Sequence, residues 1–456
     1  MGEDILLSDV RVGGGGFFEW LDPGQWISVL VGLGDNPLQA MWWFIAHGGW
    51  VILVLIFLWM LKYSWLNYIT SKAAAKKEWV LLAIDVPRAS EQTCKAIDNM
   101  FAHMAGGHSP PTFLEKWTAG HVQDTITLEI ISIEGHLQYL IRTSSKLRDL
   151  VEASIYAQYP EAEITMVEDY TRMVPDQYPN DLYDCFGTEM VPVKSDAYPL
   201  KTYLDFEDSL SGEFKDPLAV LLEAMSRLGP GEQCWYQIVL TPIDQKAFVA
   251  KAQKEIMKLT GQKAPVKKNL VEKALDLPIQ AMSTVADVAF GGGDAASGKK
   301  VDNPLQSRMW NLTPGERKVV EAIEKKMGHI QYEVKLRFLY IAKHEVFTKS
   351  KILQSFVGSM KQYNSNDLLS IKPEGKYIGV SSAIVLFKER RNNDRKGKLV
   401  RAYRNRSNWA GASRFHLGTD EIAALWHLPV VMQVKAPQLK KTEAKKAEPP
   451  INIPFA

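Results

Sequence analysis

The sequence predicts an α+β protein: one N-terminal transmembrane helix, then two ferredoxin-like (βαββαβ) units, the second with a helical and disordered insertion. Residues 36–61 contain no Asp, Glu, Lys or Arg, which indicates a membrane span. Beyond them, strand-like alternation and helical periodicity succeed one another in the order β-α-β-β-α-β, and a similar order recurs. With 46% hydrophobic and 23% charged residues, the chain has the composition of an ordinary globular protein outside this span.

The N-terminal part of the chain is expected to be organised around a membrane. Segment 1–37 should lie outside the cell, and its short apolar, glycine-rich stretch predicts an interfacial helix. Residues 38–61 are apolar on every side and long enough at helical rise to cross a bilayer of ~30 Å. Residues 62–78 form a basic juxtamembrane linker. The aromatic residues that we expect at the two membrane interfaces are Trp42, Trp43, Trp59, Tyr63 and Trp65.

The charges on either side of the apolar stretch predict its orientation. Four lysines follow it before any acidic residue, whereas Arg11 is the only basic residue among six acidic ones before it. Basic flanks stay in the cytoplasm. We therefore expect a single-pass protein of the bacterial inner membrane, with its N-terminus outside and its C-terminal domains in the cytoplasm.

Residues 79–170 are predicted to form the first ferredoxin-like domain. Its clearest signal is a hairpin in which Glu134-Gly135 separates two stretches of alternating apolar residues. A serine cap and apolar residues at helical spacing then predict a helix. The expected elements are a strand at 79–87, a helix at 91–104, strands at 125–133 and 136–144, a helix at 144–160 and a strand at 161–169.

Residues 199–430 are predicted to form a second α+β domain of similar order. An insertion at about 243–328 interrupts it, and about 260–302 of this insertion is rich in Lys, Gly and Ala and expected to be disordered. The expected elements are strands at 201–206, 233–241, 332–343 and 378–387, and helices at 217–228, 243–258, 313–327, 346–362 and from 419. The basic, Pro-rich tail 431–456 is either an extended peptide for a partner or a frayed terminus.

Recognisable catalytic, cofactor-binding and metal-binding motifs are absent from the sequence. Gly293 to Lys299 match most of the phosphate-binding pattern G-x-x-x-x-G-K-[ST], but Lys300 stands where a magnesium-ligating hydroxyl is needed. The three cysteines form no C-x-x-C pair and fit a reducing cytosol, and the histidines lack the spacing of a metal site. We therefore expect no catalytic residue, no cofactor and no metal, and hence not an enzyme.

Residues 388–406 form the most basic segment of the chain. Nine Lys and Arg residues against Glu389 and Asp394 give this segment a net charge of +7, although the whole chain carries only +2. Such a segment could bind nucleic-acid phosphates, or it could be a solvated hairpin or a surface for an acidic protein or anionic lipid. The candidate residues are Lys388, Arg390, Arg391, Arg395, Lys396, Lys398, Arg401, Arg404 and Arg406.

Four motifs carry a resemblance to a known kind of protein. They are IEGHLQYLIRTSSKLRDLVEASIYAQYPEAEI, GEQCWYQIVLTP, LGTDEIAALWHLP and AEPPINIP. Together they resemble an uncharacterised membrane-anchored domain of candidate-phyla bacteria, which often precedes a coupling-protein-type or HerA-like ATPase of conjugation and type IV secretion. The motor domain of those proteins has no counterpart in this sequence, so the resemblance implies an ATPase encoded separately.

Two functional hypotheses follow from the sequence. The leading one is a non-enzymatic, single-pass membrane scaffold of a type IV secretion or conjugation-like translocation apparatus, whose cytoplasmic part docks the ATPase. The alternative is a membrane-tethered nucleic-acid-binding protein that uses residues 388–406, with DNA as partner. The lipid bilayer is a partner under both hypotheses, and the sequence leaves open whether the chain forms a homo-oligomer.

Overall fold

The computed structural model describes residues 50–86, 92–207, 214–261, 312–380 and 387–428. The chain divides into two compact units. The smaller unit contains the described part of residues 1–76 together with 111–122, and the larger unit contains the described part of residues 77–110 and 123–456. The N-terminal segment 1–37, the tail 431–456 and the glycine-rich motif at Gly293 all lie outside the described residues.

The smaller unit is built on helix α3 (Trp50–Ala75, 26 residues). Leu53–Ala75 is the one stretch of the described chain that is long and apolar enough to cross a membrane, judged by length and composition. Of the predicted span 38–61, residues 38–49 lie outside the described part. Helix α3 continues through the predicted basic linker 62–78 as far as Ala75, so most of this linker is helical. No Gly or Pro interrupts this stretch, and Ala and Leu favour helix.

The larger unit contains one antiparallel sheet of nine strands, in the order β4-β1-β3-β2-β6-β7-β5-β8, with β9 paired to β7. Within the described residues these strands are β1 (Trp79–Asp85), β2 (Ile126–Ile133), β3 (His136–Ser144), β4 (Glu163–Met166), β5 (Tyr183–Pro192), β6 (Glu232–Pro242), β7 (Gln331–Lys343), β8 (Ile371–Pro373) and β9 (Phe415–Gly418).

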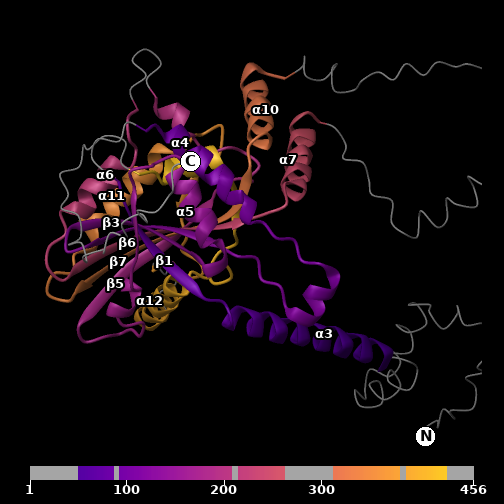
Figure 1. Cartoon of the computed structure of the whole chain (residues 1–456), viewed down its shortest axis with the longest axis horizontal. Helices are drawn as coiled ribbons and strands as arrows, with labels where there is room; N and C mark the ends of the chain where they lie inside the picture. Colours follow the sequence, from indigo (N-terminus) through magenta and orange to yellow (C-terminus); the bar gives the residue numbers. More distant parts are fainter. Residues whose placement is uncertain (1–49, 87–91, 208–213, 262–311, 381–386, 429–456) are drawn as a thin grey trace, which may run out of the picture. The chain divides into compact units, whose positions relative to one another are not determined.

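Helices cover both faces of this sheet. Figure 1 shows α4, α6 and α11 on one face and α12 on the other. The helices are α4 (Cys94–Met104), α5 (Arg148–Tyr156), α6 (Ala219–Ser226), α7 (Gln245–Leu259), α10 (Pro314–Met327), α11 (Lys349–Gln362), α12 (Lys388–Arg404) and α13 (Thr419–Leu425), with short turns η3 (Ala105–Gly107), η5 (Ser145–Leu147), η6 (Tyr170–Met173) and η7 (Tyr203–Phe206). The sheet therefore has two apolar cores, one under each helical layer.

The two predicted α+β domains, 79–170 and 199–430, contribute strands to this single sheet. The first four strands have the order β4-β1-β3-β2, and the next four have the matching order β8-β5-β7-β6. Strands β2 and β6 join the two halves in antiparallel register, from Ile126 opposite Leu240 to Ile133 opposite Gln233. Backbone hydrogen bonding thus continues across the boundary that the sequence analysis placed between two domains.

The predicted first strand of the second half, 201–206, is wrong. Tyr203–Phe206 is a 3-10 turn, which begins with reciprocal hydrogen bonds between Thr202 and Asp205. The strand at this place in the order is β5. Gly187 in its middle lacks a side chain because a Cβ there would lie 2.5 Å from the carbonyl oxygen of Phe338.

The predicted last strand, 378–387, is also wrong as far as it is described. The edge strand is instead β8, and residues 381–386 lie outside the described part. The carboxylate of Glu374 accepts hydrogen bonds from the backbone N–H groups of Lys376, Tyr377, Ile378 and Gly379. These N–H groups are therefore not available to a ladder, and the chain turns here.

Candidate functional site

The basic segment 388–406 forms helix α12 and the two residues after it. The alternative that residues 388–406 form a solvated hairpin is therefore wrong. The apolar residues Leu399, Val400 and Tyr403 are buried and pack α12 onto the sheet. The charged residues around them are consequently divided between an inner and an outer side of the helix.

The cationic side chains on the inner side of α12 bind other groups of the same chain. Arg395 Nη1 donates to the carbonyl oxygen of Gly375 at 2.7 Å, and Lys396 forms an ion pair with Asp184. Arg404 Nη2 donates to the carbonyl oxygens of Val174 at 2.6 Å and Thr171 at 3.1 Å. These contacts connect α12 to the segments around β5 and η6, so the side chains that make them serve the fold.

Arg406 is the most buried of the nine candidate cations, with 3% of its surface exposed. Its Nε donates to Glu129 Oε1 at 2.9 Å, and its Nη1 lies 2.5 Å from Asp169 Oδ2. Burial alone would lower the pKa of Arg406, but the carboxylate of Glu129 outweighs this effect and raises the pKa above its usual value. Arg406 is thus a fixed cation inside the body.

The other five candidate cations are not buried in the body as Arg406 is. Lys388, Arg390, Lys398 and Arg401 are exposed, and Arg391 is half-buried. Arg401 Nη1 also lies 3.5 Å from the carbonyl oxygen of Asp176, at the limit of a hydrogen bond. The nine residues therefore do not form one basic surface, and the exposed charge of α12 is much smaller than its sequence suggests.

A row of polar side chains crosses the interior of the sheet beneath α12. Glu129 of β2, Gln237 of β6, Arg337 of β7 and Glu189 of β5 stand opposite one another in consecutive strand pairs. Gln237 Nε2 donates to Glu129 Oε1 at 2.8 Å, Arg337 Nη1 to Gln237 Oε1 at 3.2 Å, and Arg337 Nε to Glu189 Oε1 at 2.9 Å. We call these four residues the polar row.

The polar row is closed by groups from η6, from β7 and from the segment 403–406. Arg406 and Tyr170 both donate to Glu129, and Tyr170 Oη lies 2.9 Å from Tyr403 Oη. Lys335 lies 3.6 Å from Glu189, and burial lowers the pKa of Lys335 to about 8 although Glu189 opposes this shift. The charges of the row are paired with one another, as buried charges in a stable core must be.

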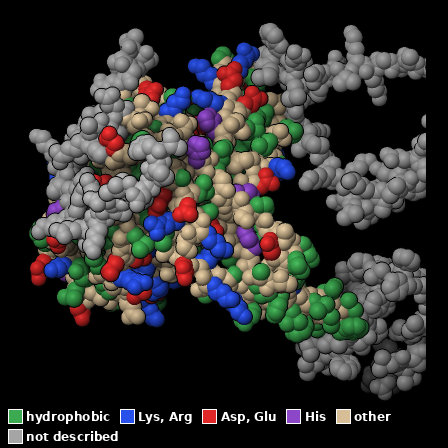
Figure 2. Space-filling model, in the orientation of Figure 1, with side chains coloured by type: hydrophobic (Ala, Val, Ile, Leu, Met, Phe, Trp, Pro, Cys, Tyr) green, Lys and Arg blue, Asp and Glu red, His purple; other side chains and the backbone are tan. Residues whose placement is uncertain are grey.

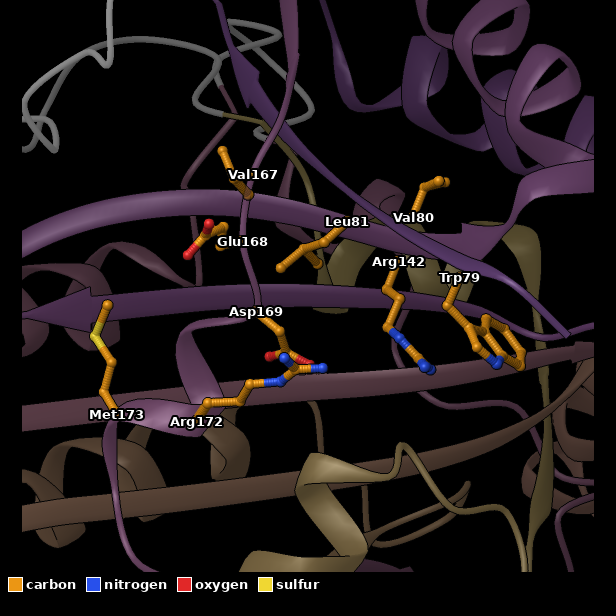
Figure 3. A pocket seen from close by; sticks show the side chains of 9 residues that line it. All are labelled: Trp79, Val80, Leu81, Arg142, Val167, Glu168, Asp169, Arg172 and Met173. Atoms are coloured by element: carbon orange, nitrogen blue, oxygen red, sulfur yellow. The ribbon is translucent and has the colours of Figure 1, made fainter. Parts of the chain in front are cut away.

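A pocket of about 690 Å³ opens beside β1 and β3 in the larger unit (Figure 3). The guanidinium carbon of Arg142 lies 4.1 Å from the centroid of the Trp79 ring. Among the described residues no group accepts a hydrogen bond from Arg142, and burial with the nearby charge of Arg406 lowers its pKa to about 10. The full lining is Trp79, Val80, Leu81, Arg142, Val167, Glu168, Asp169, Arg172 and Met173.

The pocket escaped the sequence analysis, although one signal of it was present. Arg142 follows Leu140 at a spacing of two in a strand, so its side chain shares a face with an apolar residue. An arginine at such a position needs a partner or a solvent-filled space. Glu168 and Asp169 line the pocket together with Arg142 and Arg172, so the lining carries charges of both signs.

The cysteine thiols of the described residues are not suited to act as nucleophiles. Cys94, Cys185 and Cys234 are all buried and free. Burial raises the pKa of Cys185 to about 12 and that of Cys94 and Cys234 above the usual value, so none forms a thiolate near neutral pH. No group of three or more His, Cys, Asp or Glu residues in the described part could hold a metal ion.

The aromatic residues predicted at the membrane interfaces are partly described. Trp42 and Trp43 lie outside the described residues. Trp59, Tyr63 and Trp65 are on α3, all exposed, and the rings of Trp59 and Tyr63 stack with centroids 5.9 Å apart. Their contact with lipid remains a prediction.

Comparison with known proteins places the chain in a family whose function is not known. No curated protein matches the sequence. Residues 112–441 match the model of a family described as a domain of unknown function, DUF8128. This match covers β2 to β9, α12, all four residues of the polar row and the partners of the row named above. The chain belongs to the DUF8128 family.

Proposed function

We propose that the protein is a single-pass membrane scaffold without catalytic activity, whose α+β body docks an ATPase encoded as a separate polypeptide. The apparatus that it serves is a type IV secretion or conjugation-like translocation machine in the inner membrane of a candidate-phylum bacterium, with the body in the cytoplasm. The observation that carries the proposal is helix α3, whose described side chains from Trp50 to Leu61 are apolar and exposed.

Helix α3 has the properties of a lipid-facing helix. Leu53, Phe57 and Trp59 are 53%, 59% and 64% exposed, although a water-soluble protein would bury an apolar stretch of this size. Figure 2 shows hydrophobic atoms gathered along this helix. Since the apolar side chains surround the helix, lipid covers all of them at once, whereas a groove on a partner covers one side only.

The α+β body supports a role as a docking platform. We infer that its sheet is a tandem of two ferredoxin-like units, because each half repeats the same strand order and antiparallel pairing. The backbone pairing of β2 with β6 and the polar row make the two halves one body. A body of this kind offers broad outer faces, while its internal charges are engaged in holding it together.

The nature of the partner is supported by sequence resemblance. Membrane-anchored domains with motifs similar to those between Ile133 and Ile164 often precede a coupling-protein-type or HerA-like motor. An anchored body of this kind could hold such an ATPase at the membrane. The Pro-rich tail 431–456, in which Ile451, Ile453 and Phe455 lie among three prolines, is a candidate docking peptide.

A pull-down from membranes tests this proposal. The full chain, tagged at its C-terminus and cross-linked in cells, should sediment with membranes, require detergent for release, and retrieve a motor ATPase of the translocation class. An unrelated tagged single-pass protein, treated in the same way, provides the control. Release of the chain without detergent would contradict the anchor, and recovery of no ATPase or secretion component would contradict the scaffold.

Direct binding of DNA is the second candidate function, and exposed cations on α12 favour it. If α12 binds DNA, replacing Lys388, Arg390 and Lys398 together by alanine will weaken binding and reduce the slope of its salt dependence by about 0.9 for each phosphate that the variant no longer neutralises. We expect no such change, because much of the charge of α12 is bound inside the body. The matched control replaces Arg317, Lys318 and Lys325, three cationic residues that are exposed on α10. A specific loss in the α12 variant, measured by DNA titration at several salt concentrations, would overturn the scaffold in favour of DNA binding.

A further inference from the structure

A short segment of the smaller unit exposes large apolar side chains. The chain leaves the larger unit after Pro110 and returns to it at Gln123. Between them, Phe113 is 79% exposed and Leu114 is 69% exposed. Two adjacent side chains of this size, exposed on a turn that is not part of any core, indicate a surface that lipid or another molecule covers.

This turn has a defined conformation of its own. The backbone N–H of Thr112 donates to Glu115 Oε2 at 2.9 Å, and the backbone N–H of Glu115 lies 3.3 Å from Thr112 Oγ1. This reciprocal cap begins a helical turn that continues into η4 (Glu115–Ala119). The ring of Phe113 packs against that of Trp117 with centroids 6.0 Å apart. The apolar side chains are therefore presented by a preformed turn, which lowers the cost of ordering it on a surface.

The turn is fixed to one face of α3. Trp65 Nε1 donates to the carbonyl oxygen of Trp117 at 3.2 Å, and Lys62 Nζ lies 5.6 Å from the centroid of the Trp117 ring. Gly120, with φ of +70°, fits against Ile69 because a Cβ on it would lie 2.4 Å from that residue. The three residues of α3 are spaced by three and four positions, as one face of a helix requires.

The position of these contacts along α3 identifies what the turn faces. Lys62 is the first charged residue after the apolar stretch that begins before Leu38. At a rise of ~1.5 Å per residue, Trp65 lies about 4.5 Å beyond it. A first lysine followed by tryptophan and tyrosine residues is typical of the level at which a spanning helix passes into the lipid headgroups. The turn therefore lies at this level, provided that α3 spans a membrane.

We propose that residues 112–119 are a second membrane-binding element, which inserts Phe113 and Leu114 into the boundary between lipid headgroups and acyl chains. Lys116 and Lys62 then face the headgroups, where anionic lipids favour them. The occupant of this apolar surface is lipid, because the surface continues that of the helix to which the turn is fixed. The proposal rests on the membrane anchoring proposed above.

Depth-dependent fluorescence quenching tests this insertion. The full chain is reconstituted in nanodiscs of phosphatidylcholine and phosphatidylglycerol, with Leu114→Cys labelled by nitrobenzoxadiazole. The three native cysteines are buried, so labelling is selective. We expect blue-shifted emission and stronger quenching by shallow than by deep spin-labelled lipid. The matched control is Val220→Cys on α6, an apolar side chain that is 52% exposed in the larger unit.

A third labelled site separates this proposal from the anchoring on which it rests. Leu58→Cys lies in the apolar part of α3, four residues before Lys62, and should be quenched by spin-labelled lipid, with a deeper position than Leu114→Cys. If Leu58→Cys is quenched and Leu114→Cys behaves like Val220→Cys, the membrane-binding turn is wrong and the anchor stands. If Leu58→Cys is not quenched, the anchor itself is wrong. Because the quencher is attached to the lipid, quenching at Leu114→Cys identifies lipid as the occupant.

Discussion

Replacing Arg406 by methionine will destabilise the α+β body by about 3–5 kcal/mol. The guanidinium of Arg406 donates to Glu129 at 2.9 Å and forms an ion pair with Asp169. The side chain of Glu129 is fully buried, so the variant leaves a carboxylate inside the sheet with its main cation removed. Removing one partner of a buried ion pair costs more than the pair contributes, because the remaining charge has lost its solvation as well.

Denaturant unfolding of the full chain in detergent, followed by tryptophan fluorescence, measures this loss. Trp235 reports on the site, since its ring lies 5.3 Å from that of Tyr403. Arg401→Met is the matched control, because Arg401 is exposed in the same segment and should change stability by no more than about 0.5 kcal/mol. Adding Glu129→Gln to Arg406→Met should restore part of the loss. Equal stability of the Arg406 and Arg401 variants would show that the buried network is not stabilising.

The first half of the fold was open to prediction because its signals are local. Glu134 and Gly135 both have positive φ, 54° and 87°, which is the backbone that a tight hairpin turn requires. The strands on either side of this turn alternate apolar and polar residues clearly enough to be placed within a residue or two. Local patterning does not, however, say which strand lies beside β2, and its neighbour β6 begins almost one hundred residues later.

The second half was less predictable because particular residues there conceal the pattern. Gly187 breaks the apolar run of β5, although it is buried and required by the close approach of Phe338. Glu374 turns the chain by accepting four backbone hydrogen bonds, which no periodicity in the sequence indicates. The capped helix α10 was predictable, because Thr313 and Glu316 form a cap from residues three positions apart.

The basic segment illustrates why charge density does not predict a site. A count along residues 388–406 gives +7, but the partners that neutralise these charges come from distant segments. Glu129 is 277 positions from Arg406 in sequence, and Asp184 is 212 positions from Lys396. Since a helix shows only part of its circumference to solvent, a strongly basic helix can contribute most to its own protein's interior.

The polar row helps to hold the two halves of the sheet together. Its first pair, Glu129 and Gln237, lies where the two halves of the sheet meet. Arg406, which follows α12, binds the same Glu129. The C-terminal part of the body therefore closes over the joint between the halves.

Replacing Lys326 by methionine will also destabilise the body by about 3–5 kcal/mol near neutral pH. Lys326 Nζ lies 3.0 Å from Glu421 Oε2, and the two side chains are each only 1% exposed. Lys326 also donates to the carbonyl oxygens of Tyr198 at 3.2 Å and His416 at 3.1 Å. The ammonium group therefore connects α10 to β9 and α13, and its loss leaves a buried carboxylate and two carbonyl groups without their donor.

The loss in the Lys326 variant should grow with pH. Burial raises the pKa of Glu421, and Lys326 opposes this shift. The pKa of Glu421 is therefore higher in the variant than in the native protein. A glutamic acid whose pKa is raised in the folded state stabilises the fold at pH values below its pKa in the unfolded chain, about 4.3. This stabilisation is lost as the pH rises through the pKa of the folded state. Thermal unfolding at several values between about pH 5 and 8 should therefore show an increasing difference from the native protein.

Two further variants test this explanation of the pH dependence. Lys318→Met, on the exposed side of the same helix, should be as stable as the native protein at every pH. Adding Glu421→Gln to Lys326→Met should remove most of the increase, because the carboxylate that pairs with Lys326 is gone. The remainder comes from Asp420, whose pKa Lys326 also lowers. The carboxylates whose pKa values are lowered, such as those of Asp169 and Asp216, lose their stabilising effect at acid pH in all of these proteins and cancel in the comparison. A difference that stays constant with pH would mean that lost packing, and not the buried charge of Glu421, destabilises the variant.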